Sequence, residues 1–328
     1  MVCLFLIIGL AFFYFLTPMS KGKDTTYLYI DKDDTVDSVF QKLTPLANSH
    51  AMSGFTTLVR HSHYADNIRT GRYQIEPSNN SITVFRNLKN GRQTPMRLTV
   101  PSVRTTERLS AELGRKLMLD STEIANALTN QDLCEQYGYD TCTIVCMFIP
   151  NTYELYWNIS LNAFLLRMKK ESDAFWTEER TKKAETAGMT REEVMTLASI
   201  IDEETANNGE KPMIAGMYIN RLHKDMPLQA DPTVKFALKE FGLRRIYNKL
   251  LRVDSPYNTY RYKGLPPGPI RIPSVAGIDA VLNFDHHDYL YMCAKEDFSG
   301  THNFAVTYDE HLKNATKYSQ ALNKQGIK

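Results

Sequence analysis

The pattern of apolar and polar positions over residues 190–205 predicts a helix with a carboxylate on its buried face. Thr190 and Glu193 form a capping box, so the helix begins there. Positions 194, 197, 200 and 201 are apolar and recur at helical spacing. Glu204 follows the last two of them by four and three residues, so it lies on the same face. If the helix instead frayed at Thr205, this carboxylate would be an ordinary surface charge.

A carboxylate on an apolar face has an unusual acidity. Burial disfavours the charged form, so we expect the pKa of Glu204 to be raised. Asp202 and Glu203 are turned away from that face by the helical rotation. A protonated carboxyl near neutral pH is what a general acid requires, which makes Glu204 the candidate catalytic residue.

The segment from residue 19 to 97 predicts a small α+β unit. TTYLYI and GRYQI are typical of strands, and DDTVDSVFQKL and SITVFRNL are typical of helices. Such a module could bind a ligand or hold the next domain away from a membrane. The sequence favours the spacer.

Residues 98–328 predict a larger, mostly helical domain, which makes the fold class of the whole chain α+β. MRLTV reads as a strand, TTERLSAELGRKL and DSTEIANAL as helices, and IVCMFIP as a buried strand stopped by Pro150. Helices are then expected from Leu161 to about Glu240, one of them over residues 211–224. After further loops and short strands, Thr307 and Glu310 cap a last helix that runs to about Ala321.

The first 18 residues are almost wholly apolar from Val2 to Leu16. The run is short for a membrane span, which needs about 20 residues, and it lacks the basic start and cleavage site of a signal peptide. We expect residues 1–18 to be an uncleaved transmembrane anchor whose first residues are missing from this sequence. Lys21 and Lys23 lie on the side that the positive-inside rule disfavours. A buried core helix is the alternative.

Composition narrows the function classes. The net charge is +2, hydrophobic residues make up 43% and charged residues 23%, which is ordinary for a globular protein and gives no reason to expect nucleic acid. The cysteines form no C-x-x-C pair, so we expect no metal site. If the body of the protein is exported, the sequence leaves open whether Cys134 and Cys142 form a disulfide. No P-loop, G-x-S-x-G or H-E-x-x-H motif is present, so no cofactor is expected.

Polar residues downstream of Glu204 point to a carbohydrate cleft. A helix ends near Asn220, and LQADPTV then brings Gln229, Asp231 and Thr233 together. We expect Asp231 to cap a helix that starts at Pro232. A helix cap explains Asp231 fully but leaves Gln229 unexplained.

The segment from Ser255 to Pro273 is rich in proline and glycine and predicts a rigid loop of the kind that carries binding sites. Tyr257, Asn258 and Tyr260 suit sugar rings and hydroxyls, although tyrosines also simply pack. His302, in THNF, falls near a strand and could be structural or functional. No second carboxylate is an obvious partner for Glu204, unlike the pair that most glycosidases use.

Six motifs in this order resemble the endolytic murein transglycosylases, the MltG or YceG-like family. They are LASIIDEET (197–205), YINRL (218–222), LQADPTV (228–234), YNTY (257–260), GLPPGPI (264–270) and HNF (302–304). A weaker likeness covers most of the body, including MFIPNTYEL (147–155). The family's catalytic glutamate maps onto Glu204, while Asp202 stands where the family usually has glutamate, which leaves the supporting role of that position open.

The resemblance implies a membrane-anchored lytic transglycosylase that cleaves the MurNAc–GlcNAc β-1,4 bond of peptidoglycan. Glu204 would protonate the leaving oxygen and then act as base on the MurNAc 6-hydroxyl, leaving a 1,6-anhydroMurNAc end. Because the substrate supplies the nucleophile, one carboxyl suffices. The resemblance further implies a LysM-like subdomain at residues 19–97 and a body outside the inner membrane. Partners would be peptidoglycan strands, which the enzyme stops elongating, and elongation synthases. A silent wall-binding scaffold and a hydrolytic muramidase are the alternatives.

Overall fold

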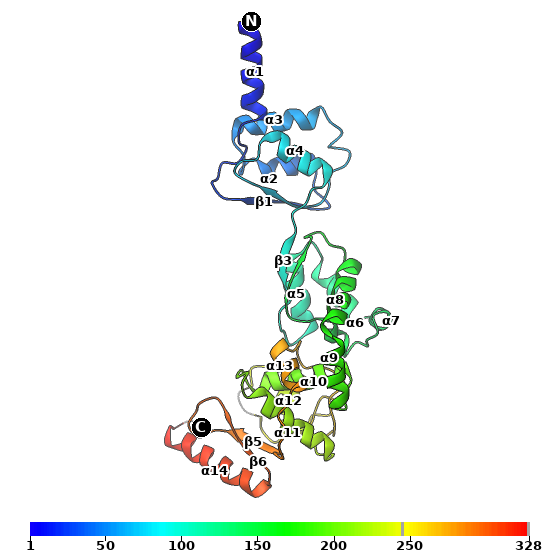
Figure 1. Cartoon of the computed structure of the whole chain (residues 1–328), viewed down its shortest axis with the longest axis vertical. Helices are drawn as coiled ribbons and strands as arrows, with labels where there is room; N and C mark the ends of the chain where they lie inside the picture. The colour runs from blue at the N-terminus through cyan, green and yellow to red at the C-terminus, as the bar shows by residue number, and fades with distance from the viewer. Residues whose placement is uncertain (244–245, 327–328) are drawn as a thin grey trace. The chain divides into compact units, whose positions relative to one another are not determined.

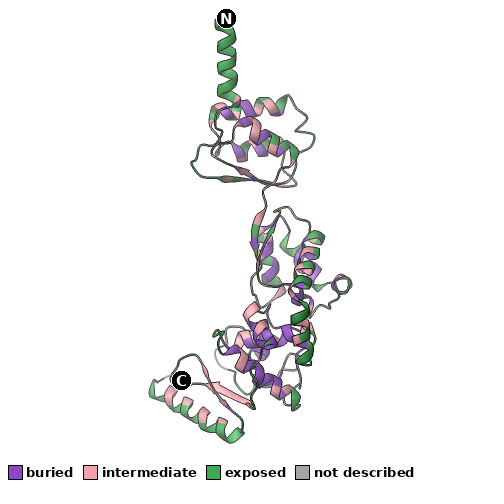
Figure 2. Cartoon of the chain, in the orientation of Figure 1, coloured by how far each residue is buried: buried purple, intermediate pink, exposed green. Residues whose placement is uncertain are grey.

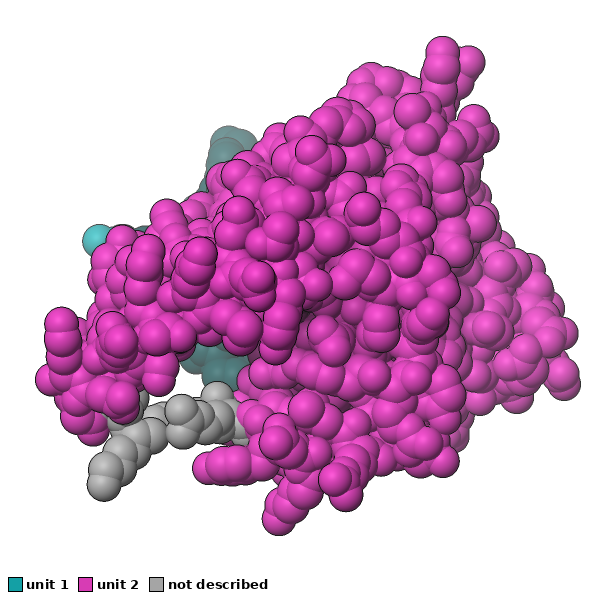
Figure 3. Space-filling model, turned by 90° about the horizontal axis from the view of Figure 1, so that it is seen from below, with its two compact units in different colours: residues 1–98, 113–120, 152–161 teal, residues 99–112, 121–151, 162–328 magenta. Residues whose placement is uncertain are grey.

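The computed structural model describes residues 1–243 and 246–326. Its internal contacts divide the chain into two compact units, which Figure 3 colours separately. Unit 1 comprises residues 1–98, 113–120 and 152–161, and unit 2 comprises residues 99–112, 121–151 and 162–328. The predicted catalytic domain, 98–328, ends on two residues that lie outside the described part.

Unit 1 is a small α+β body (Figure 1). Its strands β1 and β2 pair antiparallel, with Thr26 opposite Ile75. The sequence prediction omits helix α3, although Ala51, Phe55 and Val59 recur at helical spacing and are buried. The elements of this unit after its first helix are β1 (Thr26–Ile30), α2 (Val36–Leu43), α3 (Ser49–Arg60), β2 (Gly71–Ile75), α4 (Ser81–Asn90) and β3 (Met96–Thr99), which pairs with β4 (Thr152–Leu155).

Helix α1 (Val2–Phe15) is apolar and buries none of its residues (Figure 2). Its last turn is fixed to the rest of unit 1, because the Ser81 hydroxyl donates to the Tyr14 carbonyl at 3.0 Å. Gly54 of α3 packs directly against the same carbonyl, where a larger side chain would not fit. Among the described residues, none of the helices has the length and apolar composition that a bilayer crossing requires.

Unit 2 is mostly helical, and its core forms around α10 (Arg191–Glu204). Every residue from Val194 to Ile201 is buried (Figure 2), because α11 (Lys211–His223) and α13 (Val275–Leu282) pack against this helix. The other helices from residue 106 onward are α5 (Thr106–Lys116), α6 (Ser121–Thr129), α7 (Gln131–Gln136), α8 (Leu161–Phe175), α9 (Glu178–Thr186), α12 (Asp231–Leu238) and the 3-10 turn Leu250–Arg252. A hairpin of β5 (Tyr291–Ala294) and β6 (His302–Ala305) precedes the last helix, α14 (Tyr308–Lys324).

These elements confirm the α+β class and the predicted run of helices after Leu161. The buried strand predicted at IVCMFIP is wrong, because Ile144–Met147 form a short 3-10 helix. The Asp140 carboxylate accepts hydrogen bonds from the backbone N–H groups of Cys142 and Thr143 at 2.9 and 2.7 Å, and it tightens the preceding chain into a turn. An apolar run without periodicity fits either structure.

Two other expectations are corrected by the geometry. The cysteines are unpaired, with Cys134 buried in α7 and Cys142 half-buried beyond it, so the disulfide left open by the sequence is not formed. Asp231 does not cap α12. That helix begins at Asp231 with Ala230 at the cap position, and the Asp231 carboxylate instead accepts a hydrogen bond from the Tyr260 hydroxyl at 2.6 Å.

Candidate active site

Helix α10 places Glu204 at its last turn with a fixed register. The predicted capping box is present: the Thr190 hydroxyl accepts from the Glu193 N–H at 3.1 Å, and the Glu193 carboxylate accepts from the Thr190 N–H at 2.8 Å. The helix continues without interruption to Glu204. A capped start and a fully buried middle fix the rotation of the helix, so the direction of the Glu204 side chain follows from its position in the sequence.

The surroundings of the Glu204 carboxyl raise its pKa. Burial raises its pKa from the ordinary 4.5 to about 7, and the nearby Asp231 charge adds to this rise. The Tyr218 hydroxyl opposes the rise by donating to Oε1 at 2.8 Å, and the charges of His302 and Lys235 oppose it more weakly. Because Oε1 already accepts a hydrogen bond from the Tyr218 hydroxyl, Oε2 is the oxygen that carries the acidic proton. About half of the carboxyls are therefore protonated near neutral pH.

Glu204 faces a polar cleft of about 350 Å³ that helices, a turn and the hairpin enclose. This volume is in the range of small-ligand sites. The cleft is lined by Glu204 from α10, by Met217, Tyr218 and Arg221 from α11, by Leu228, Gln229 and Asp231, by Tyr260, by Met292, Cys293 and Ala294 from β5, by His302 from β6 and by His311 from α14.

A buried arginine supports one wall of this cleft. Arg221 is 7% exposed and donates to the backbone carbonyls of Leu290 and Leu228 at 2.6 and 2.8 Å. It also donates to Oε1 of Gln229 at 3.4 Å. Gln229 adopts a φ of 51°, a left-handed conformation that is uncommon for a residue with a side chain and that clusters at functional sites.

The structure brings four of the predicted site residues together with Glu204: Gln229, Asp231, Tyr260 and His302. Asp231 matters most for the chemistry, because it is a second carboxylate in the same cleft. The expectation that Glu204 has no such neighbour is therefore wrong. The Asp231 carboxylate accepts from the Tyr260 hydroxyl, so the pair forms a polar edge beside the acid.

Three other predicted site residues are part of the framework. Thr233 is fully buried, and its hydroxyl donates to the Ala230 carbonyl at 2.7 Å. Asn258 is also fully buried and donates to the carbonyls of Leu251 and Val253 at 2.9 and 2.8 Å. Asn220 donates to the His287 carbonyl at 2.6 Å and to the Tyr289 carbonyl at 3.1 Å. They hold the α12 turn, the proline-rich loop and the approach to the hairpin in place.

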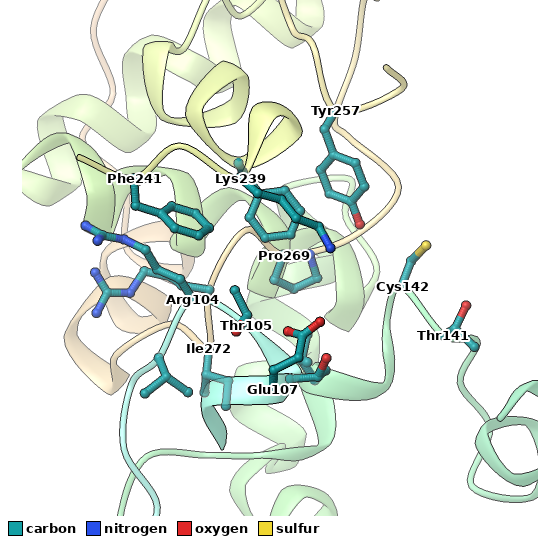
Figure 4. A pocket seen from close by; sticks show the side chains of 15 residues that line it. Arg104, Thr105, Glu107, Thr141, Cys142, Lys239, Phe241, Tyr257, Pro269 and Ile272 are labelled. Atoms are coloured by element: carbon teal, nitrogen blue, oxygen red, sulfur yellow. The ribbon is translucent and has the colours of Figure 1, made fainter. Parts of the chain in front are cut away.

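Tyr257 lines a different pocket, of about 200 Å³, which Figure 4 shows from close by. Its ring packs on Phe236 at 4.8 Å between centroids. Lys239 and Glu107 face the same space. The hydrogen bonds that Glu107 accepts lower its pKa, and the Lys239 charge lowers it further. Glu204 does not line this pocket.

The two acids before Glu204 anchor the end of α10. Asp202 accepts from Lys211 Nζ at 2.7 Å and from the Ser274 hydroxyl at 2.9 Å, at the start of α13. Glu203 accepts two bonds from Arg104, at 2.7 and 2.8 Å, and one from Arg271 at 2.9 Å. Both carboxylates point away from the cleft, as predicted from the helical rotation.

Sequence reasoning missed Tyr218 and Glu210 and gave Arg221 no role. Tyr218 and Arg221 are three residues apart on α11 and so share a face, which is a pattern that the sequence does contain. Glu210 has no such signal. Its carboxylate meets His302, 92 positions further along the chain, and only the folded structure brings them together.

The fold and the site define an α+β protein with one protonatable carboxyl in a polar cleft. The chain belongs to the YceG-like family, whose model matches residues 28–317. It is 42% identical over 132 residues to an endolytic murein transglycosylase of Bacillus subtilis (strain 168), covering 40% of this chain and 36% of that protein. A second, from Streptococcus pneumoniae (strain D39), is 24% identical over 298 residues, covering 80% of this chain and 53% of that protein.

The chain thus spans about half, or less, of the length of these curated relatives. A crystal structure of a yceG-like protein from Listeria monocytogenes has the same fold. The match has a TM-score of 0.56 and 26% identity, and it covers 89% of this chain and 99% of that one.

Proposed function

We propose that the protein is an endolytic lytic transglycosylase that cleaves the MurNAc–GlcNAc β-1,4 bond of peptidoglycan. The observation that carries this proposal is the Glu204 carboxyl, with a pKa of about 7 and with Tyr218 bound to Oε1. Such a group is protonated often enough at neutral pH to act as a general acid. The curated relatives named endolytic murein transglycosylases support the substrate.

In the simplest scheme Glu204 performs both proton transfers. Its Oε2 proton passes to the glycosidic oxygen as the bond from that oxygen to the anomeric carbon breaks. The MurNAc 6-hydroxyl oxygen bonds to the anomeric carbon, and its proton passes to the Glu204 carboxylate. No water is consumed, and the product carries a 1,6-anhydroMurNAc end. Acting within strands, the enzyme would end the elongation of nascent glycan.

A hydrolytic muramidase is the second candidate, because Asp231 lies in the same cleft. Two carboxyls can share hydrolysis, one as acid and the other as nucleophile or as base on water. The Asp231 carboxylate accepts a hydrogen bond from the Tyr260 hydroxyl at 2.6 Å, which fixes its position in the cleft. The products differ by one water, so mass separates the two reactions.

The experiment incubates purified glycan strands with the protein and with Glu204→Gln, and reads the ends of the products by mass. Anhydro ends from the wild type and none from the variant are expected. Reducing ends would establish the hydrolase. Binding of strands without any product would establish a silent scaffold, which is the remaining alternative.

The finer organisation belongs to the same proposal. Helix α1 would anchor the protein in the cell membrane, since its apolar side chains are exposed to solvent. Residues 19–97 would form a LysM-like module, and the body would act on the outer side of the membrane beside the elongation synthases. Labelling the chain with a membrane-impermeant reagent in cells, followed by fractionation, tests the anchor and the orientation.

A further inference from the structure

Glu210 and His302 form a hydrogen-bonded pair that takes no part in a mechanism in which Glu204 performs both proton transfers. Glu210 is the residue before α11, and its Oε1 accepts from the His302 backbone N–H at 2.6 Å. Its Oε2 lies 3.0 Å from Nδ1 of the His302 ring. The side chains are only 9% and 15% exposed. One carboxylate therefore holds both the backbone and the ring of a single histidine.

This arrangement selects one tautomer of the ring. An ionised carboxylate can only accept hydrogen bonds, so the Nδ1 that faces Glu210 must carry the hydrogen. In the neutral ring Nε2 then has the free lone pair. A carboxylate bound to one ring nitrogen also stabilises the cation that forms when the other nitrogen takes a proton. The geometry thus makes Nε2 of His302 a hydrogen-bond acceptor and a base.

His302 shares the cleft with the candidate acid. It lines the same cavity as Glu204, and the two groups are close enough for their charges to interact. Apart from tyrosines, the other titratable groups that line this cavity are Arg221, Asp231, Cys293 and His311. Arg221 is turned to backbone carbonyls and Asp231 to Tyr260. His311 packs its ring on Tyr291, at 5.5 Å between centroids. Of the two histidines that line the cleft, His302 is the one whose ring is oriented by a carboxylate.

We infer that His302, positioned by Glu210, is the base that takes the proton of the attacking hydroxyl, while Glu204 serves as the acid alone. This inference rests on the proposed function, and it reassigns the second proton transfer. Glu210 is a positioning residue, because it acts through His302 and does not touch the substrate.

The step balances without a further reagent. The proton of the 6-hydroxyl passes to Nε2 as its oxygen bonds to the anomeric carbon. The bond from that carbon to the leaving oxygen breaks, and the Glu204 proton passes to this oxygen. The cleft is left with an imidazolium and a carboxylate. Transfer of one proton from His302 to Glu204 through solvent restores the starting state.

The first test measures the tautomer. In the full chain with ¹⁵N-labelled histidine, long-range ¹H–¹⁵N NMR spectra above the titration of the ring should show the hydrogen of His302 on Nδ1, with the signal assigned from His302→Gln. In Glu210→Gln the amide nitrogen can donate to the ring, so the hydrogen is expected to move to Nε2. A wild-type ring with its hydrogen on Nε2 would overturn the inference, whether or not the protein cleaves peptidoglycan.

The second test measures turnover on glycan strands as a function of pH. Glu210→Gln and His302→Gln should each lower kcat by about 100-fold or more with KM within about threefold, since general-base catalysis contributes about 10²–10⁴-fold. The acid limb of the wild-type profile, which reports the base of the reaction, should be absent from His302→Gln. Glu296→Gln is the matched control, because Glu296 lies in the same hairpin region, accepts from Asn303 at 2.8 Å and does not line the cleft.

The outcomes separate the two claims. If the wild type forms anhydro ends and both variants keep kcat within threefold, His302 is not the base while the proposed function stands. If the wild type forms no anhydro ends, the proposed function fails and the base role falls with it. Should Glu210→Gln fail to fold, His302→Gln decides alone, because it leaves Glu210 in place.

Discussion

Replacing Glu204 by glutamine removes an acidic proton and, at the same time, a charge that the folded state disfavours. In the wild type the pKa of Glu204 rises from 4.5 to about 7 on folding. A carboxyl with a raised pKa binds its proton more tightly in the folded state, so its contribution to stability falls as the pH rises from about 4.5 to 7. The glutamine of the variant does not ionise, so it makes no pH-dependent contribution to stability.

The magnitude follows from the size of that rise. At about 1.4 kcal/mol per pH unit, the full change is worth about 3 kcal/mol above pH 7. Because Glu204 is partly exposed, solvent reduces this figure, and part of the change is already present at pH 5. We expect the free energy of unfolding of Glu204→Gln, relative to wild type, to be about 1–2 kcal/mol larger at pH 8 than at pH 5, so that the variant gains relative stability as the pH rises.

Urea denaturation at the two pH values measures this difference, with activity on glycan strands measured in parallel. Activity should fall by about 10²–10⁴-fold, the usual contribution of a general acid. Glu185→Gln, on the exposed side of α9, is the control and should show the same difference at both pH values. An equal difference for Glu204→Gln at pH 5 and pH 8 would refute the reasoning, because Glu204 would then not be the protonated acid of the folded protein.

Three further substitutions test neighbouring contacts. Tyr218→Phe removes the hydrogen bond that lowers the pKa of Glu204, so the basic limb of the pH–rate profile should move to higher pH, and a limb that stays fixed would contradict this. Asp231→Asn removes a charge that raises the same pKa; the limb should move to lower pH while anhydro products persist, and complete loss of product would support the hydrolase instead. Gly277→Ala would place a methyl group 2.7 Å from the Asp202 carboxylate, and we expect a loss of about 1–3 kcal/mol in unfolding free energy, measured with urea.

The part of the site that depends on local sequence was predictable. The box formed by Thr190 and Glu193, followed by apolar positions at helical spacing, sets the register of α10 within one segment. The direction of Glu204 follows from that register without any tertiary contact. For the same reason the last helix, α14, was placed correctly, since Thr307 and Glu310 form its capping box, whereas α13, in a region predicted as loops and short strands, was missed.

The part that depends on distant contacts was not predictable. Tyr218 meets Glu204 across two packed helices, and Glu210 meets His302 across two segments that are far apart in the sequence. The polar residues of the loop from Ser255 to Pro273 differ in their roles. Asn258 and Tyr260 are two positions apart, yet Asn258 is fully buried against backbone carbonyls while Tyr260 lines the cleft. Residue type gives no means of telling them apart, because an irregular loop has no periodicity to assign a face.

The three consecutive acids at the end of α10 point in different directions because of the helical rotation, and each makes different contacts. Each successive side chain turns by about 100°. Asp202 therefore reaches Lys211 and the start of α13, and Glu203 reaches Arg104 and Arg271. Glu204 reaches the cleft.

Their functions are linked although their contacts are separate. Asp202 and Glu203 tie the last turn of α10 on two sides, and this turn would otherwise be prone to fray. A Cβ added at Gly277 would lie 2.7 Å from the Asp202 carboxylate, so the start of α13 packs closely on this aspartate. The two ion-paired acids thus hold the backbone that keeps the third acid, Glu204, aimed into the cleft.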